Sequence, residues 1–123
     1  MAHSEPACVF CKIVRREIPS TIVYEDGRVL AFKDIHPIAP VHILVVPKHH
    51  VATLNDVDDD NVEHVAALLA AARPVAEAMG VRDEGYRVFF NVGRGAGQEV
   101  FHVHMHLVAR AKLSKIVDDL AGK

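Results

Sequence analysis

The segment His102-Val103-His104-Met105-His106-Leu107-Val108 lies within a predicted strand over 100–109, and it decides how the whole sequence is interpreted. Histidines occupy every second position, and apolar residues fill the positions between them. Because alternate side chains of a strand point to opposite faces, the pattern predicts an apolar face in the core and three imidazoles on the other face. Imidazole is both a metal ligand and a nucleophile near neutral pH. The pattern therefore predicts a metal site or a nucleophilic centre. A solvent-facing strand that is histidine-rich by chance is the alternative interpretation.

The residues before this strand favour a phosphate-binding site. Asn91 is followed by a glycine-rich loop, GRGAGQ, at 93–98. Glycines carry no Cβ, so the loop backbone can approach an anionic oxygen closely. The loop leads into a strand rather than a helix and lacks the Gly-Lys-Ser/Thr of a P-loop, so neither a P-loop nor a dinucleotide-binding fold is expected.

Apolar periodicity predicts two helices. Helical spacing in CVFCKIVRRE (8–17) predicts a short helix, and apolar residues spaced by threes and fours between 62 and 79 predict a long one. The acidic stretch DVDDD (56–60) offers N-cap candidates for the long helix, and Gly80 is a natural end. Pro74 removes one backbone donor, so we expect a kink or an early end there.

Four further strands complete the predicted sheet. TIVYE (21–25) and RVLAF (28–32) flank Asp26-Gly27, a dipeptide typical of a tight hairpin turn with positive φ angles. The apolar, β-branched run at 41–46 predicts a buried strand, and YRVFFNV (86–92) predicts another. We see no repeat and no domain boundary.

Length and composition predict one globular domain. The 123 residues are 50% hydrophobic and carry a formal net charge of −2. We expect a single domain over 1–123, with a core at 8–110 and short tails. No basic block could neutralise a run of backbone phosphates, so long nucleic acid is not an expected partner. No apolar leader or membrane-length apolar run is present, so we expect no membrane association and a cytoplasmic location.

The triad segment matches His-φ-His-φ-His-φ-φ, with φ apolar, and so resembles the motif that names the histidine triad (HIT) proteins. Two longer stretches, IPSTIVYEDGRVLAFKDIHPIAPVHILVVPKHH (18–50) and NVGRGAGQEVFHVHMHLV (91–108), are similar to the Hint, or nucleotide-binding, branch. The resemblance implies an α+β fold, with a five-stranded antiparallel sheet, one long helix and one short helix. It also implies a homodimer in which the sheet continues from one subunit to the other.

The same resemblance implies roles for the histidines. His104 corresponds to the nucleophile, which is transiently nucleotidylated in two successive displacements that need no catalytic cofactor. His106 would donate to a phosphoryl oxygen, His102 completes the triad, and His42 would support it. Backbone N–H groups near Gly97, Gln98 and Glu99 would stabilise charge that develops on the phosphate. A bound nucleotide of the AMP or GMP class is then expected to contact Asp34, Ile35, Asn91, Gly97, Gln98, Glu99, Val100, Phe10, Ile18 and Phe32.

Some of these residues have simpler interpretations. Phe10, Ile18 and Phe32 could be ordinary core residues. Asp34 could cap a turn. Where several Hint proteins carry Ser after Gly-Gln, this chain has Glu99, which leaves the leaving-group preference open.

The implied activity is hydrolysis at the α-phosphate of a nucleoside 5′-monophosphate, of the purine nucleoside phosphoramidase type. Hydrolysis of a dinucleoside polyphosphate and nucleotidyl transfer to a sugar phosphate use the same histidine intermediate and remain alternatives. A non-catalytic nucleotide-binding or partner-binding module, and a metallohydrolase with zinc on all three triad histidines, are further alternatives.

Two cysteines suggest a second site. Cys8-x-x-Cys11 forms half of a tetrahedral zinc site, while a redox pair or two inert cysteines are the other interpretations. In HIT members with this pair, the other ligands are a His after Pro-Lys-x and the first triad His, here His50 and His102. The resemblance therefore implies a structural zinc that leaves His104 free for catalysis.

Overall fold

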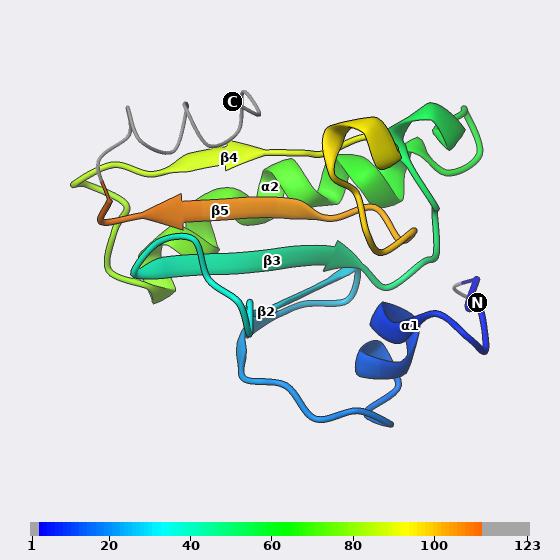
Figure 1. The fold of residues 1–123 in the computed structure, drawn as a ribbon, viewed down its shortest axis with the longest axis horizontal. Helices are drawn as coiled ribbons and strands as arrows, with labels where there is room; N and C mark the ends of the chain where they lie inside the picture. The colour runs from blue at the N-terminus through cyan, green and yellow to red at the C-terminus, as the bar shows by residue number, and fades with distance from the viewer. Residues whose placement is uncertain (1–2, 112–123) are drawn as a thin grey trace.

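The computed structural model describes residues 3–111 of the chain, and within them a five-stranded sheet runs across the molecule with a helix on each face (Figure 1). The C-terminal tail predicted after residue 110 lies almost wholly outside the described residues. No helix of the described part is long and apolar enough to cross a membrane. The elements are α1 (Val9–Val14), β1 (Ile22–Glu25), β2 (Val29–Lys33), β3 (Val41–Pro47), the 3₁₀ turn η1 (Leu54–Asp56), α2 (Val62–Ala78), β4 (Arg87–Phe89), the 3₁₀ turn η2 (Arg94–Ala96) and β5 (Met105–Ala109).

The sheet order is β1-β2-β3-β5-β4, and every neighbouring pair is antiparallel. The predicted five-stranded antiparallel sheet, with one long and one short helix, is confirmed. β3 and β5 lie side by side at the centre, where Leu44 pairs with His106. Phe89 of β4 pairs with His106 from the other side. The third triad histidine is thus held between two strands.

The side chains of β2 and β3 alternate between two apolar layers. One layer, which includes Ile43 and Met105, packs under α2 around the fully buried Leu68. The opposite layer, which includes Leu44, packs against Phe10 of α1. Because both faces are covered, β3 is buried along its whole length, as expected for a strand with a continuous apolar sequence.

The hairpin between β1 and β2 forms where predicted, but the physical reason for its turn is different. Gly27 is not among the glycines with positive φ. Instead, the Asp26 carboxylate accepts hydrogen bonds from the backbone N–H groups of Arg28 and Val29, at 2.8 and 2.9 Å. An aspartate side chain that closes its own turn does not require a left-handed glycine.

The long helix α2 also forms where predicted, and Gly80, with φ of 72°, follows its end. Its N-cap residue is Asn61, whose side chain makes no capping hydrogen bond. The acidic residue Asp58 organises the preceding turn by accepting from Asp60 N and Asn61 N. α2 continues past Pro74 to Ala78, so the early end does not occur.

The histidine strand is shorter than predicted. β5 begins only at Met105, so His102 and His104 precede the hydrogen-bonded ladder. The alternation nevertheless holds for the apolar residues, because Val103, Met105 and Leu107 all enter the core beneath α2. The histidines leave that core in different directions, and this divergence creates two separate sites.

Candidate functional site

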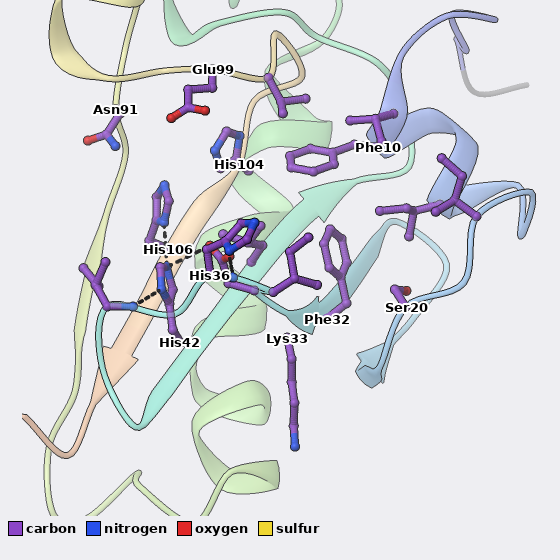
Figure 2. A pocket seen from close by; sticks show the side chains of 18 of the residues that line it. Phe10, Ser20, Phe32, Lys33, His36, His42, Asn91, Glu99, His104 and His106 are labelled. Atoms are coloured by element: carbon purple, nitrogen blue, oxygen red, sulfur yellow. Dashed lines mark hydrogen bonds and ion pairs between the residues drawn. The ribbon is translucent and has the colours of Figure 1, made fainter.

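A cavity of about 490 Å³ lies between α1, the central strands and two loops. Figure 2 shows His104 and His106 beside Asn91 and Glu99 in one part of this pocket, and Phe32 and Ser20 away from them. The structure thus brings together most of the residues expected at a nucleotide site. Those that line the cavity are Phe10, Ile18, Phe32, Asp34, Ile35, His42, Asn91, Gly97, Glu99, Val100, His104 and His106.

The apolar wall serves the pocket and the core at once. The rings of Phe10 and Phe32 meet edge to face with centroids 5.5 Å apart, and both side chains are almost fully buried. The Phe10 ring also meets the His104 ring at 5.1 Å and 90°. Phe10 and Phe32 therefore belong to the core and also line the pocket, because the pocket borders this part of the core.

His104 presents an unprotonated nitrogen to the pocket. Its Nδ1 lies 2.8 Å from the carbonyl oxygen of His102, which can only accept a hydrogen bond, so Nδ1 carries the proton. Burial lowers the pKa of His104 below its ordinary value, which keeps the ring neutral at neutral pH. The lone pair is then on Nε2, the geometry that a nucleophile requires.

His106 presents the opposite group, an N–H. The Ile38 backbone N–H donates to His42 Nδ1 at 3.1 Å, so the proton of neutral His42 is on Nε2. His42 Nε2 lies 2.9 Å from His106 Nδ1 and donates to it, so the His106 proton is on its own Nε2. Burial, with a smaller effect of His104 and His42, lowers the pKa of His106 to about 3 and keeps it neutral.

His106 Nε2 is buried and has no hydrogen-bond partner among the described residues. An unpaired buried N–H costs about 1–3 kcal/mol, so the site gains when a ligand oxygen accepts from it. Phe89 stacks flat on the same ring, with centroids 4.5 Å apart and planes inclined by 4°. The protein therefore fixes both the proton and the plane of His106 before any ligand arrives.

Asp34 closes a turn and also lines the pocket. Its Oδ1 accepts from His36 N at 2.8 Å and so closes a turn, while Oδ2 lies 3.5 Å from His42 Nε2 at the pocket edge. Ile35 follows on the same loop and is 85% exposed although it lines the pocket. A large apolar side chain that stays in solvent beside a cavity is available to cover a ligand.

Gln98 shapes the glycine-rich loop from inside. Its Oε1 accepts from Gly93 N at 2.9 Å, and its Nε2 donates to the carbonyl oxygens of Ala52 and Val100. The side chain is buried and does not line the pocket. The N–H groups of Gly97 and Gln98 donate to carbonyls of the same loop, so the Glu99 N–H is the remaining candidate from the expected set of amides.

Sequence reasoning did not find Phe89, which stacks on His106, or Ile38, whose amide sets the proton of His42. No local pattern marks either residue, because their roles depend on strand register and on a loop path. Other pocket-lining residues that it did not name are Val9, Ile13, Pro19, Ser20, Lys33, His36 and Leu44.

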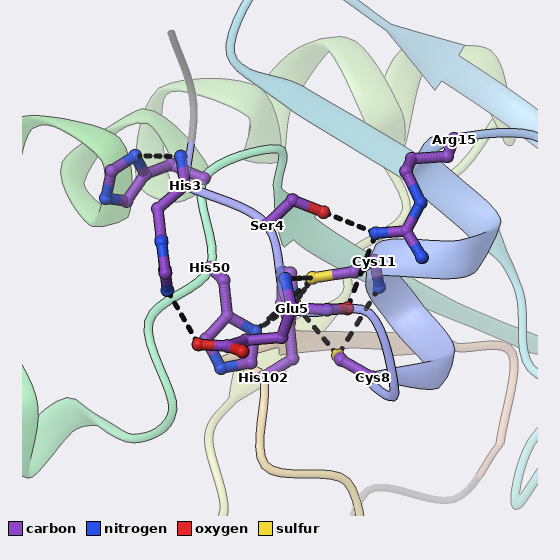
Figure 3. A network of polar contacts seen from close by, with 9 residues as sticks. His3, Ser4, Glu5, Cys8, Cys11, Arg15, His50 and His102 are labelled. Atoms are coloured by element: carbon purple, nitrogen blue, oxygen red, sulfur yellow. Dashed lines mark hydrogen bonds and ion pairs between the residues drawn. The ribbon is translucent and has the colours of Figure 1, made fainter.

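The remaining triad histidine belongs to a second site (Figure 3). His102 Nδ1 lies 3.4 Å from Cys8 Sγ, 3.5 Å from Cys11 Sγ and 3.2 Å from His50 Nδ1. His102 Nε2 donates to the Pro47 carbonyl at 2.8 Å, so its Nδ1 lone pair faces the cysteines. The predicted set of four residues therefore converges, and all four candidate ligand atoms lie within 4.8 Å of one another.

These separations suit a tetrahedral metal ion. With zinc–nitrogen and zinc–sulfur bonds of ordinary length, two nitrogens of a tetrahedron lie about 3.3 Å apart and a nitrogen and a sulfur about 3.6 Å apart. Backbone N–H groups of Glu5 and Cys11 point at Cys11 Sγ and Cys8 Sγ, at 3.4 Å each, as they would at metal-bound thiolates. Burial raises the pKa of the Cys8 thiol, whereas a reactive redox cysteine needs a lowered pKa.

The triad does not form one three-histidine metal centre. His102 faces the cysteines, whereas His104 and His106 face the pocket. A second group of possible ligands, Asp34, His42 and His106, lies at the pocket. Its geometry is explained by hydrogen bonds, because the amide of Ile38 occupies His42 Nδ1 and leaves a proton, not a lone pair, on Nε2.

Known proteins match this chain over most of its length. The HIT domain model matches residues 15–113. A purine nucleoside phosphoramidase of Escherichia coli (strain K12) is 44% identical over 109 residues, which are 89% of this chain and 92% of the relative. A 14 kDa zinc-binding protein of Zea mays is 44% identical over 108 residues, which cover 86% of this chain and 84% of that protein. The solved structure of a HIT family hydrolase from Clostridium thermocellum superposes with a TM-score of 0.85 at 47% identity, covering 89% of this chain and 96% of that one.

Proposed function

The chain belongs to the HIT family, and we propose that it is a hydrolase that cleaves a substituent from the α-phosphate of a purine nucleoside 5′-monophosphate. The observation that carries the proposal is the pair of neighbouring imidazoles, one with a lone pair on Nε2 and one with a proton there. A nucleophile beside a hydrogen-bond donor suits attack on phosphorus, since the donor stabilises charge on a phosphoryl oxygen. The E. coli relative, named a purine nucleoside phosphoramidase, supports this substrate class.

The first step makes a nucleotidyl-histidine. His104 Nε2 forms a bond to the α-phosphorus, and the bond from phosphorus to the leaving nitrogen breaks, so that nitrogen departs with the electron pair and takes a proton from water. His106 Nε2–H donates to a non-bridging oxygen throughout. The His102 carbonyl stabilises the positive charge that develops on the attacking ring, because it already accepts from Nδ1–H at 2.8 Å.

The second step returns the enzyme to its starting state. The oxygen of a water molecule bonds to phosphorus, the nitrogen–phosphorus bond to His104 breaks, and the water gives up a proton to solvent. The products are the nucleoside monophosphate and an amine. Because both steps use the same positioned donor, neither requires a catalytic metal or other cofactor.

The nucleoside fits the apolar part of the pocket. Phe10, Ile18 and Phe32 offer a wall for a flat base, and Asp34 Oδ2 is placed for a ribose hydroxyl. Asn91 lies beside the histidines and would contact the sugar and phosphate of the bound nucleotide. Most of the binding free energy then comes from the base, while the chemistry takes place at the histidines.

Replacement of the nucleophile tests this proposal. With adenosine 5′-phosphoramidate, we expect His104→Ala to lower kcat by about 10³-fold or more, because the neighbouring His106 presents an N–H and cannot replace the lone pair of His104. His64→Ala, which removes a histidine outside the pocket, should keep kcat within about twofold of wild type. AMP release is measured by chromatography, and AMP binding by calorimetry.

Two outcomes would contradict the proposal. If His104→Ala releases AMP as fast as wild type, His104 is not the nucleophile. If wild type binds AMP but turns over neither the phosphoramidate nor a dinucleoside polyphosphate, the chain is a nucleotide-binding module.

We also propose that Cys8, Cys11, His50 and His102 hold a structural zinc ion. The closed donor set of two sulfurs and two nitrogens is typical of structural sites and leaves no position for substrate. The ion would link α1 to the residues that lead into β5, close to the nucleophile. The zinc-binding relative from maize supports this assignment.

We expect about one zinc per chain by atomic emission spectroscopy, and less than a tenth of that in Cys11→Ala, which removes a buried ligand. The same variant should melt well below wild type, because it loses the zinc ion that links α1 to the residues before β5. Both cysteines of the chain are proposed ligands, so neither can serve as a control. Ser4→Ala, near the site but not at a ligand, is the control instead. Full zinc content in Cys11→Ala would rule the site out.

Within residues 3–111, β4 is an edge strand of the sheet, and we propose that two chains pair there as a homodimer with a continuous sheet. Val88 of this strand is 37% exposed, and an open edge strand is a ready template for pairing. Light scattering after size-exclusion chromatography should give twice the chain mass of 13.5 kDa, and Val88→Pro should shift it toward the monomer. A monomer at all concentrations would contradict this pairing.

A further inference from the structure

The part of the pocket around His104 and His106 carries almost no positive charge. Burial lowers the pKa values of His42 and His106, so both are neutral at neutral pH. Lys33 is the one Lys or Arg among the described residues that line the pocket. Figure 2 shows its side chain directed away from the histidines. Enzymes that hold polyphosphate groups commonly use Lys or Arg side chains, and among the described pocket residues neither is directed toward the histidines.

Two carboxylates line the same pocket, and only one of them is engaged elsewhere. Asp34 closes its turn through His36 N and lies 3.5 Å from His42 Nε2. Glu99 is exposed and forms no ion pair or side-chain hydrogen bond within residues 3–111. It lies next to His104, on the side away from Phe32 and Ser20 (Figure 2). A substituent on the phosphate that does not enter the apolar part therefore passes Glu99.

From this distribution of charge we propose that Glu99 determines leaving-group specificity, selecting amine leaving groups that carry a second positive charge and rejecting anionic ones such as phosphates. The inference rests on the proposed function, since it concerns the group that His104 displaces. The natural substrate class is then a nucleoside phosphoramidate, or a related mixed compound, whose leaving group has a free ammonium. Dinucleoside polyphosphates and sugar phosphates are disfavoured because their leaving groups place negative charge beside a carboxylate that no Lys or Arg of residues 3–111 offsets.

The experiment compares three substrates with the same reacting bond. Each is AMP joined through a P–N bond to a short alkyl chain, which ends in an ammonium, a methyl or a carboxylate group. For wild type we expect kcat/KM to fall in that order, with about a 10-fold difference between the ammonium and carboxylate substrates, because attraction of the ammonium and repulsion of the carboxylate both contribute. In Glu99→Gln the difference should shrink to about twofold, and in Glu99→Lys the order should reverse.

The quantity compared is the ratio between substrates within each variant, so a general loss of activity in a variant does not affect the result. Asp83→Asn removes the same charge from a side chain that is 94% exposed and outside the pocket, and its ratio should equal that of wild type. Raising the salt concentration should reduce the wild-type ratio, because exposed charges are screened.

Failure of this inference can be told from failure of the proposed function. If all three substrates release AMP in a His104-dependent manner but the ratio is the same in wild type and Glu99→Gln, Glu99 does not determine specificity and the inference is wrong. If none of them releases AMP, the proposed function fails, and this inference fails with it. If the ratio of kcat/KM between the ammonium and carboxylate substrates falls to about twofold in Glu99→Gln and is reversed in Glu99→Lys, the result supports the proposed function and the role of Glu99.

Discussion

The antiparallel pairing of β3 with β5 is the constraint on which both sites depend. It sets Leu44 opposite His106, which brings His42, two residues earlier in β3, within 2.9 Å of His106. At the other end of β3, the Pro47 carbonyl accepts from His102 and turns its lone pair toward the cysteines. The buried, β-branched sequence of β3 fixes this register, because a slip of one residue would exchange its two apolar layers.

Hydrogen bonds then divide three chemically identical imidazoles into three roles. A carbonyl sets the proton of His104, and a chain from the Ile38 amide through His42 sets that of His106. His102 is the link between the two sites, since its ring belongs to the cysteine cluster while its carbonyl accepts from the ring of His104. The proton position of each imidazole and the site to which it belongs are set by its hydrogen-bond partners, not by residue identity.

Patterns with short-range physical causes could be predicted from the sequence. The strands, both helices and the apolar side of the histidine segment follow from periodicity, and the four-residue cluster from the family resemblance. Features that depend on tertiary register could not be predicted. The stacking of Phe89 on His106 requires the β4–β5 pairing. The predicted positive φ at Gly27 is wrong because the Asp26 carboxylate accepts from the backbone of the turn, and the dipeptide Asp26-Gly27 is compatible with either kind of turn.

The central claim is that hydrogen bonds made before substrate binds give His104 a free lone pair and His106 a free N–H. Long-range ¹H–¹⁵N spectra of histidine-labelled protein at pH 7 measure this directly, because they distinguish the two neutral tautomers and the cation. The account predicts the Nδ1–H form for His104 and the Nε2–H form for His42 and His106, with His106 still neutral at pH 5, since burial lowers its pKa to about 3. An Nδ1–H form or a cation at His106 would contradict the account.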